Sequence, residues 1–126
     1  MPKRSPTNAE LEILRVLWQH GPSTVRDVHE SLDHPRPVGY TTVLKLLQIM
    51  VEKGLVRRDA SARSHVYAAV ASQGATQRRM VADLVQRVFG GSTLGLVLHA
   101  LESTPATAPE LDQIRKLLDE KKGGHP

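Results

Sequence analysis

Residues 39–59 read GYTTVLKLLQIMVEKGLVRRD, and this stretch decides the fold. At about 100° per residue, an α-helix through it gathers four apolar side chains on one face: Val43, Leu46, Leu47 and Met50. The opposite face carries Thr41, Lys45, Gln48 and Glu52, while Leu44 and Ile49 lie on the flanks. One face therefore belongs to a core, and the other meets water or a partner.

The residues that follow this helix predict a β-hairpin. We expect the helix to run from Tyr40 to Lys53, with Gly54 as its left-handed C-cap. Residues 55–58 have the character of a strand, residues 59–63 that of a loop, and residues 64–68 that of the returning strand.

Two further helices precede this stretch. Thr7 and Glu10 have the spacing of a capping box, and apolar periodicity continues to His20, where a Gly-Pro pair ends the helix. Ser23 is the predicted cap of a second helix, and the two prolines of residues 33–37 predict a loop. Three helices followed by a hairpin are typical of a winged helix-turn-helix.

The remaining residues predict three short helices, over residues 75–89, from Ser92 to about Glu102, and over residues 110–121. A Gly-Gly pair separates the first two, and a Pro/Thr loop over residues 103–109 precedes the third. Each helix has an apolar face with no obvious partner in the chain. These faces could fold back on the first half, but we favour homodimerisation. The predicted fold is mainly α with a small β-hairpin. It has a winged-helix domain over residues 1–72 and a helical dimerisation domain over residues 73–126.

Composition limits the functional classes. The chain of 126 residues has a net charge of +4 and no cysteine, which excludes disulfides, thiolate metal sites and a cysteine nucleophile. We find no signal peptide, and no run approaches the roughly 20 apolar residues of a membrane span. The prediction is a cytoplasmic protein that does not insert into membranes.

The positive charge is concentrated in the first 72 residues, which hold ten Lys and Arg against seven Asp and Glu. The outward face of the helix over residues 40–53 offers short polar groups, a lysine and an amide, which are suited to base edges in a major groove. A solvated face is the alternative. We favour DNA because the third helix of a helix-turn-helix enters the groove, and because Arg57, Arg58, Arg63 and His65 follow on the hairpin.

Three segments together resemble the penicillinase and methicillin-resistance repressor family (BlaI/MecI/CopY): residues 11–32, LEILRVLWQHGPSTVRDVHESL; residues 39–59; and residues 84–103, LVQRVFGGSTLGLVLHALES. The resemblance extends from about Asn8 to Glu120. It implies a transcriptional repressor whose winged helix binds a palindromic operator in double-stranded DNA and whose C-terminal helices form a homodimer. It also implies a DNA-contacting set of Tyr40, Thr41, Thr42, Lys45, Gln48 and Arg63.

The chain also departs from that family. Leu44 and Ile49 stand where some relatives carry arginine or threonine, so the bases contacted can differ. The absence of cysteine excludes copper sensing through a C-terminal cysteine cluster. In the antibiotic-responsive branch, a membrane metalloprotease sensor leads to cleavage of an Asn-Phe bond, and the aligned bond here is His99–Ala100.

Other functions have weaker support in the sequence. Six histidines raise the question of a metal site, but none are spaced four apart on a helix, and we predict no metal and no cofactor. No catalytic motif is present, so we predict no enzyme. The main alternative is a winged-helix regulator released by a small molecule bound at the helical interface. A winged helix used only for protein–protein contact is a further one.

Overall fold

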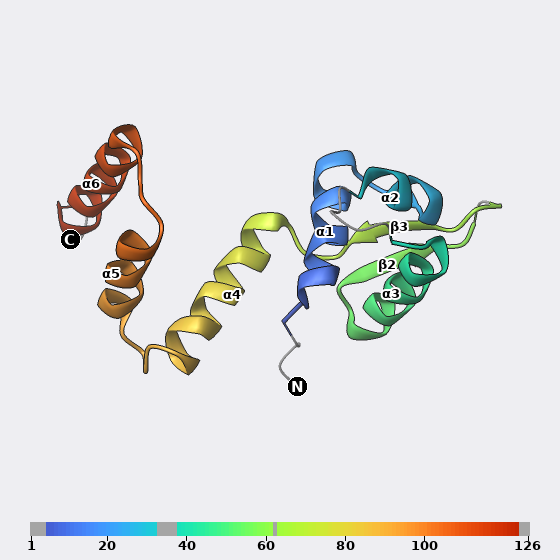
Figure 1. Ribbon diagram of the computed structural model, residues 1–126, viewed down its shortest axis with the longest axis horizontal. Coiled ribbons are helices and arrows are strands. Elements are labelled where there is room, and N and C mark those ends of the chain that lie inside the picture. The colour runs from blue at the N-terminus through green and yellow to red at the C-terminus, as the bar shows by residue number, and fades with distance from the viewer. Residues whose placement is uncertain (1–4, 33–37, 62, 124–126) are drawn as a thin grey trace. The chain divides into compact units, whose positions relative to one another are not determined.

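The computed structural model describes residues 5–32, 38–61 and 63–123. The chain divides into two compact units, Met1–Val81 and Ala82–Pro126, and each is described by itself (Figure 1). The loop predicted over residues 33–37 lies outside the described residues. The predicted domains, residues 1–72 and 73–126, are defined by function, and that division stays a prediction.

The first helix forms as its sequence predicts. Helix α1 (Asn8–His20) begins after Thr7, whose hydroxyl accepts from the Glu10 N–H while the Glu10 carboxylate accepts from the Thr7 N–H. It ends at Gly21, whose φ of 84° suits a residue without a side chain.

The start of the second helix differs from the prediction by one residue. Ser23 is not the cap, because Ser23–Thr24 form a short strand, β1, and the Ser23 hydroxyl donates to the Gly21 carbonyl. Thr24 caps α2 (Val25–Ser31) and forms a second capping box with Asp27. Arg26 is therefore the second residue of α2.

Helix α3 spans Tyr40–Lys53 and ends in the left-handed Gly54, both as predicted. Val43, Leu47 and Met50 are completely buried, and Leu46 is partly buried. The periodicity therefore identified the inward face correctly.

The predicted hairpin is confirmed, with strand ends shifted by one or two residues. Strands β2 (Val56–Asp59) and β3 (Val66–Ala69) pair antiparallel, with Arg58 opposite Tyr67. Strand β1 pairs with the other edge of β3, so the sheet has three strands in the order β1-β3-β2. The hairpin loop extends beyond the helices in Figure 1.

One core holds this first unit together. It draws on all three helices and on the sheet: Ile13, Leu14, Val16, Leu17, Val25, Val28, Val43, Leu47, Met50, Val56 and Tyr67. Trp18 packs against it, and its indole N–H donates to the Ala71 carbonyl at 2.9 Å. Tyr67 is 1% exposed, so its ring packs in this core. The core therefore holds α3 and strands β2 and β3 together within the first unit.

An ion pair joins the start of α1 to the end of α3. The Lys53 ammonium lies 2.9 Å from a carboxylate oxygen of Glu10, which is 1% exposed. Burial alone would raise the pKa of the Glu10 carboxyl. The N–H of Thr7 and the Lys53 ammonium outweigh that effect and hold the pKa below its ordinary value. Glu10 thus remains ionised and clamps the end of α3 to the start of α1.

The remaining helices are α4 (Gln73–Arg87), α5 (Thr93–Ser103) and α6 (Ala108–Gly123). Helix α4 begins and ends two residues earlier than predicted. Helix α5 begins at Thr93, one residue later than predicted, because Ser92 is its N-cap. Helix α6 begins at Ala108, two residues earlier than predicted, so the preceding loop is shorter than predicted. Thr107 caps the helix, and Pro109 lies in its first turn, where proline is tolerated. None of these three helices contains a buried residue in the part of the chain that is described.

Candidate nucleic-acid interface

The outward face of α3 is exposed along its length. Tyr40, Thr41, Thr42, Lys45 and Gln48 are all exposed, and Tyr40 is 49% exposed. Neither Lys45 nor Gln48 has a hydrogen-bond partner among residues 5–32, 38–61 and 63–123. Their donors and acceptors are therefore available to a ligand. Leu44 and Ile49 are partly buried on the flanks, as predicted.

A groove of about 550 Å³ connects the start of α3 with the hairpin. Tyr40 and Leu44 contribute from α3, and Arg63, Ser64 and His65 contribute from the hairpin loop. The first turn of α2 and the central strand complete it with Thr24, Val25, Arg26 and Tyr67. The groove thus unites Tyr40 and Arg63 of the predicted site, whereas Thr41, Thr42, Lys45 and Gln48 do not line it and lie on the exposed face of α3.

The groove is positively charged. Of the described residues that line it, none is acidic, and Arg26 and Arg63 carry guanidinium groups. Both arginines are exposed, and neither is in an ion pair with a described residue. Such a surface attracts a polyanion.

Arg26 is a candidate residue that our sequence analysis missed. The capping box of Thr24 and Asp27 could have located it, because that motif sets the first turn of α2. Its place beside Arg63 depends on the fold, since 37 positions separate them in the chain.

The one carboxylate of strands β2 and β3 belongs to Asp59, which fixes the hairpin turn. The Ser61 N–H donates to Asp59 Oδ1 at 2.9 Å. The hydroxyl and the N–H of Ser61 hold the pKa of the Asp59 carboxyl below its ordinary value. Asp59 is therefore ionised at neutral pH and shapes the loop that presents Arg63.

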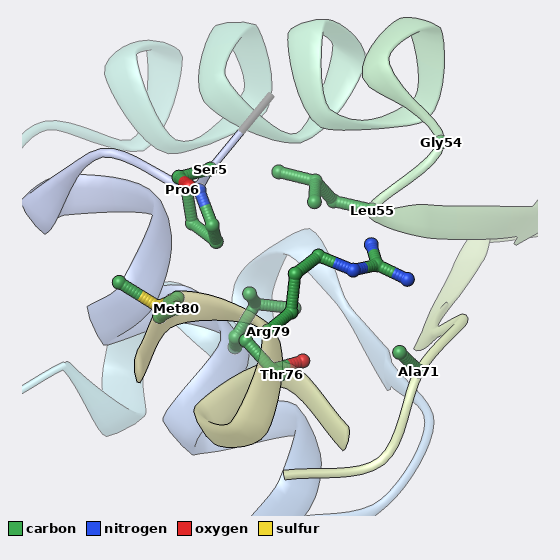
Figure 2. A pocket seen from close by; sticks show the side chains of 9 residues that line it. Ser5, Pro6, Gly54, Leu55, Ala71, Thr76, Arg79 and Met80 are labelled. Carbon is green, nitrogen blue, oxygen red and sulfur yellow. The ribbon is translucent and has the colours of Figure 1, made fainter. Parts of the chain in front are cut away.

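A second pocket lies where α4 starts, within the first unit (Figure 2). Pro6, Leu55, Thr76 and Met80 surround it, and the Arg79 side chain extends from α4 toward Leu55. Its volume is about 20 Å³, which is room for roughly one water molecule. An organic effector does not fit there.

Among the described residues, no group of three or more His, Cys, Asp or Glu side chains could hold a metal ion; His34 lies outside those residues. Across the same part of the chain, no helix has both the length and the apolar character that a membrane crossing requires.

His99 and Ala100, the predicted cleavage site, are exposed and lie within α5. The His99 ring packs at 5.6 Å against Phe89, measured between ring centroids. The His99 carbonyl accepts from the Ser103 hydroxyl, and the Ala100 carbonyl accepts from the Thr104 N–H. The bond between them is therefore accessible from solvent but held in helical geometry.

Three helices, a hairpin packed on them and a basic groove between α3 and that hairpin define a winged-helix protein. Residues 6–120 match the penicillinase repressor family, and the chain belongs to that family of DNA-binding transcriptional repressors, which are not enzymes. The predicted family and fold class are thereby confirmed.

The chain is similar to individual proteins over different shares of its length. The chain is 35% identical over 118 residues to the transcriptional regulator BlaI of Mycobacterium tuberculosis, covering 92% of this chain and 84% of that protein. It is 22% identical to the penicillinase repressor of Bacillus licheniformis, covering 92% and 91%. The solution structure of monomeric Bacillus licheniformis BlaI with the blaP half-operator covers 58% of this chain and 89% of that one, at 22% identity and a TM-score of 0.49.

Proposed function

We propose that this protein represses transcription as a homodimer on an inverted-repeat operator in double-stranded DNA in the cytoplasm. The main support for DNA binding is the basic groove next to the exposed face of α3. In this proposal α3 enters the major groove, where Tyr40, Thr41, Thr42, Lys45 and Gln48 meet base edges and phosphates. Arg63 on the hairpin and Arg26 on α2 bind the phosphate backbone on either side.

The exposed apolar side chains of the second unit support the dimer. Several large ones are at least 40% exposed in the single chain: Leu84, Val88, Leu94, Val97, Leu98, Leu101, Leu111, Leu117 and Leu118. Monomeric proteins rarely leave so many apolar side chains in contact with water. A second copy offers the same helices and buries both sets, and a two-fold dimer then presents two α3 helices to an inverted repeat.

For release of the operator we propose cleavage at His99–Ala100 after a signal from a membrane metalloprotease sensor. The exposure of both residues supports it. A protease binds its substrate extended, so the end of α5 must open first. Cleavage there separates α6 from the first unit and so removes part of the proposed dimer interface.

Selection from a pool of randomised duplexes tests DNA recognition. The wild-type protein is expected to enrich an inverted repeat and to bind it more tightly than a random duplex of equal length at moderate salt. Failure to enrich any sequence contradicts operator binding. Mass spectrometry of the protein from induced cells tests the release step, because the cleaved chain ends at His99. An intact chain after induction favours release by a small molecule instead.

A further inference from the structure

We propose that His29 is a positioning residue for operator recognition, because it fixes the start of α3 and with it the Tyr40 side chain. This inference rests on the proposed function, since it assumes that α3 contacts the operator. His29 lies in the last turn of α2 and is partly buried.

The first contact of His29 is to the backbone just before α3. Its ring Nε2 lies 2.6 Å from the carbonyl oxygen of Val38, two residues before the first residue of α3. A carbonyl oxygen only accepts hydrogen bonds, so Nε2 carries the hydrogen and donates it. Val38 itself packs against the core. The bond therefore ties the entry to α3 to a helix that the core already holds.

The second contact is to the first side chain of α3. The rings of His29 and Tyr40 meet edge to face, with centroids 6.1 Å apart and planes at 76°. Tyr40 also lines the basic groove that contains Arg63. One imidazole thus holds both the backbone before α3 and the side chain at the boundary between α3 and the groove.

The N-terminus of α3 needs such a contact because it lacks a cap of its own. Thr7 and Thr24 close α1 and α2 with complete capping boxes. The N-cap of α3 is Gly39, which provides no side-chain hydrogen bond. Glycine is also the residue with the greatest backbone freedom. His29 supplies from α2 the constraint that the local sequence omits.

The test compares His29→Leu with His29→Gln, whose amide nitrogen can reach the position of Nε2 and donate. The matched control is His20→Leu, the same change at the exposed end of α1. Each variant is titrated with a duplex selected by the wild-type protein and with a random duplex of equal length. Trp18, the single tryptophan, reports the melting temperature of the first unit by fluorescence.

His29→Leu is expected to weaken binding to the selected duplex about three- to tenfold, the range of one hydrogen bond. Affinity for the random duplex and the salt dependence should not change, because the arginines that meet phosphates are intact. His29→Gln should restore the preference for the selected duplex, and His20→Leu should leave it unchanged. A purely structural role would lower the melting temperature and leave that preference at its wild-type value.

The inference is overturned if His29→Leu keeps the wild-type preference, or loses affinity equally for both duplexes. Should that variant not fold, nitrogen-15 NMR of the wild-type ring at pH 8 decides: hydrogen on Nε2 supports the inference, and hydrogen on Nδ1 overturns it. A wild-type protein that selects no duplex contradicts the proposed function itself. That failure is recognised before any variant is made.

Discussion

The two units of this chain use apolar residues in opposite ways. Residues up to Val81 include every buried side chain in the described part of the chain, among them Val28, Val43 and Leu47 at 0% exposure. In the second unit, α5 is at least as apolar as α1 and α3 of the first unit. Yet Leu94 on α5 is 67% exposed, and Leu118 on α6 is 57% exposed. The first unit has a core of its own, and the second has the surface from which a core could be made with another molecule.

In the proposed function, the first unit recognises DNA and the second unit associates with another copy. DNA recognition needs side chains at fixed positions, and a core closed by α1, α2, α3 and the sheet provides them. Association needs apolar surface that stays exposed until a partner arrives. A substitution in the first unit should therefore alter DNA binding or stability at any protein concentration. A substitution in the second unit should alter dimer formation, so its effect should depend on protein concentration.

The largest effect is expected from Leu118→Asp on α6. In a dimer this change buries an unpaired carboxylate at a cost of several kcal/mol, whereas in a monomer it touches only water. Light scattering should show monomers or unfolded chains. Lys116→Asp places the same carboxylate on the opposite face of α6 and should leave the dimer intact. A wild-type protein that is a folded monomer at micromolar concentration would contradict the claim that a second copy covers the apolar surface of the second unit.

Lys53→Met probes the core of the first unit. It leaves the Glu10 carboxylate buried without its cation, so stability at pH 7 should fall by about 1–3 kcal/mol. The partners of Glu10 lower its pKa, so their stabilisation is present above the ordinary carboxyl pKa and is lost as pH falls through the lowered value. The difference between wild type and variant should thus shrink toward pH 3. Urea unfolding, monitored by Trp18 fluorescence, measures the free energy of unfolding of both proteins. A difference between them that does not change with pH would contradict a role for the ion pair.

Lys45→Ala addresses the exposed face of α3. If Lys45 meets a base edge, operator affinity should fall by roughly 1–3 kcal/mol and the preference at one base position should relax. If Lys45 meets only phosphate, binding should weaken equally on all sequences. Affinity measurements on single-base variants of the selected duplex distinguish the two cases. Unchanged affinity and preference would exclude Lys45 from the interface.

The smallest effect is expected from Arg63→Ala on the hairpin. Arg63 is exposed and is in no ion pair with a described residue, so its loss should leave the melting temperature unchanged. On DNA, each lost phosphate contact lowers the slope of log affinity against log salt by about 0.9. Binding to the selected duplex and to a random duplex should weaken together. Arg26→Ala should have the same effect on both duplexes. Coincident salt titrations for wild type and Arg63→Ala would mean that the hairpin does not touch DNA.

Local patterns in the sequence were sufficient to predict most of the first unit. The capping box of Thr7, the inward face of α3 and the left-handed Gly54 all depend on residues within a few positions of one another, and all three are observed. The periodicity of α3 indicated Thr41, Lys45 and Gln48, and the basic residues of the hairpin included Arg63. Tyr40 and Thr42 joined the proposed set only through the family resemblance. Their contacts with DNA stay predictions.

The features that sequence analysis missed depend on residues far apart in the chain. Ser23 pairs with Tyr67 across the sheet, so no local pattern indicated that strand β1 would replace a helix cap. Glu10 and Lys53 meet across 43 positions, and each alone resembles an ordinary charged residue on a helix. Arg26 likewise joins the candidate site only when the hairpin closes the groove.

The most direct test is the mass, by light scattering, of the protein free and bound to the duplex that it selects. Each chain has a mass of 13.9 kDa. We predict two chains in the free protein and two chains on one inverted repeat, with the random duplex left unbound at the same salt concentration. A free monomer, or one chain per duplex with no preference for the selected sequence, would contradict the account.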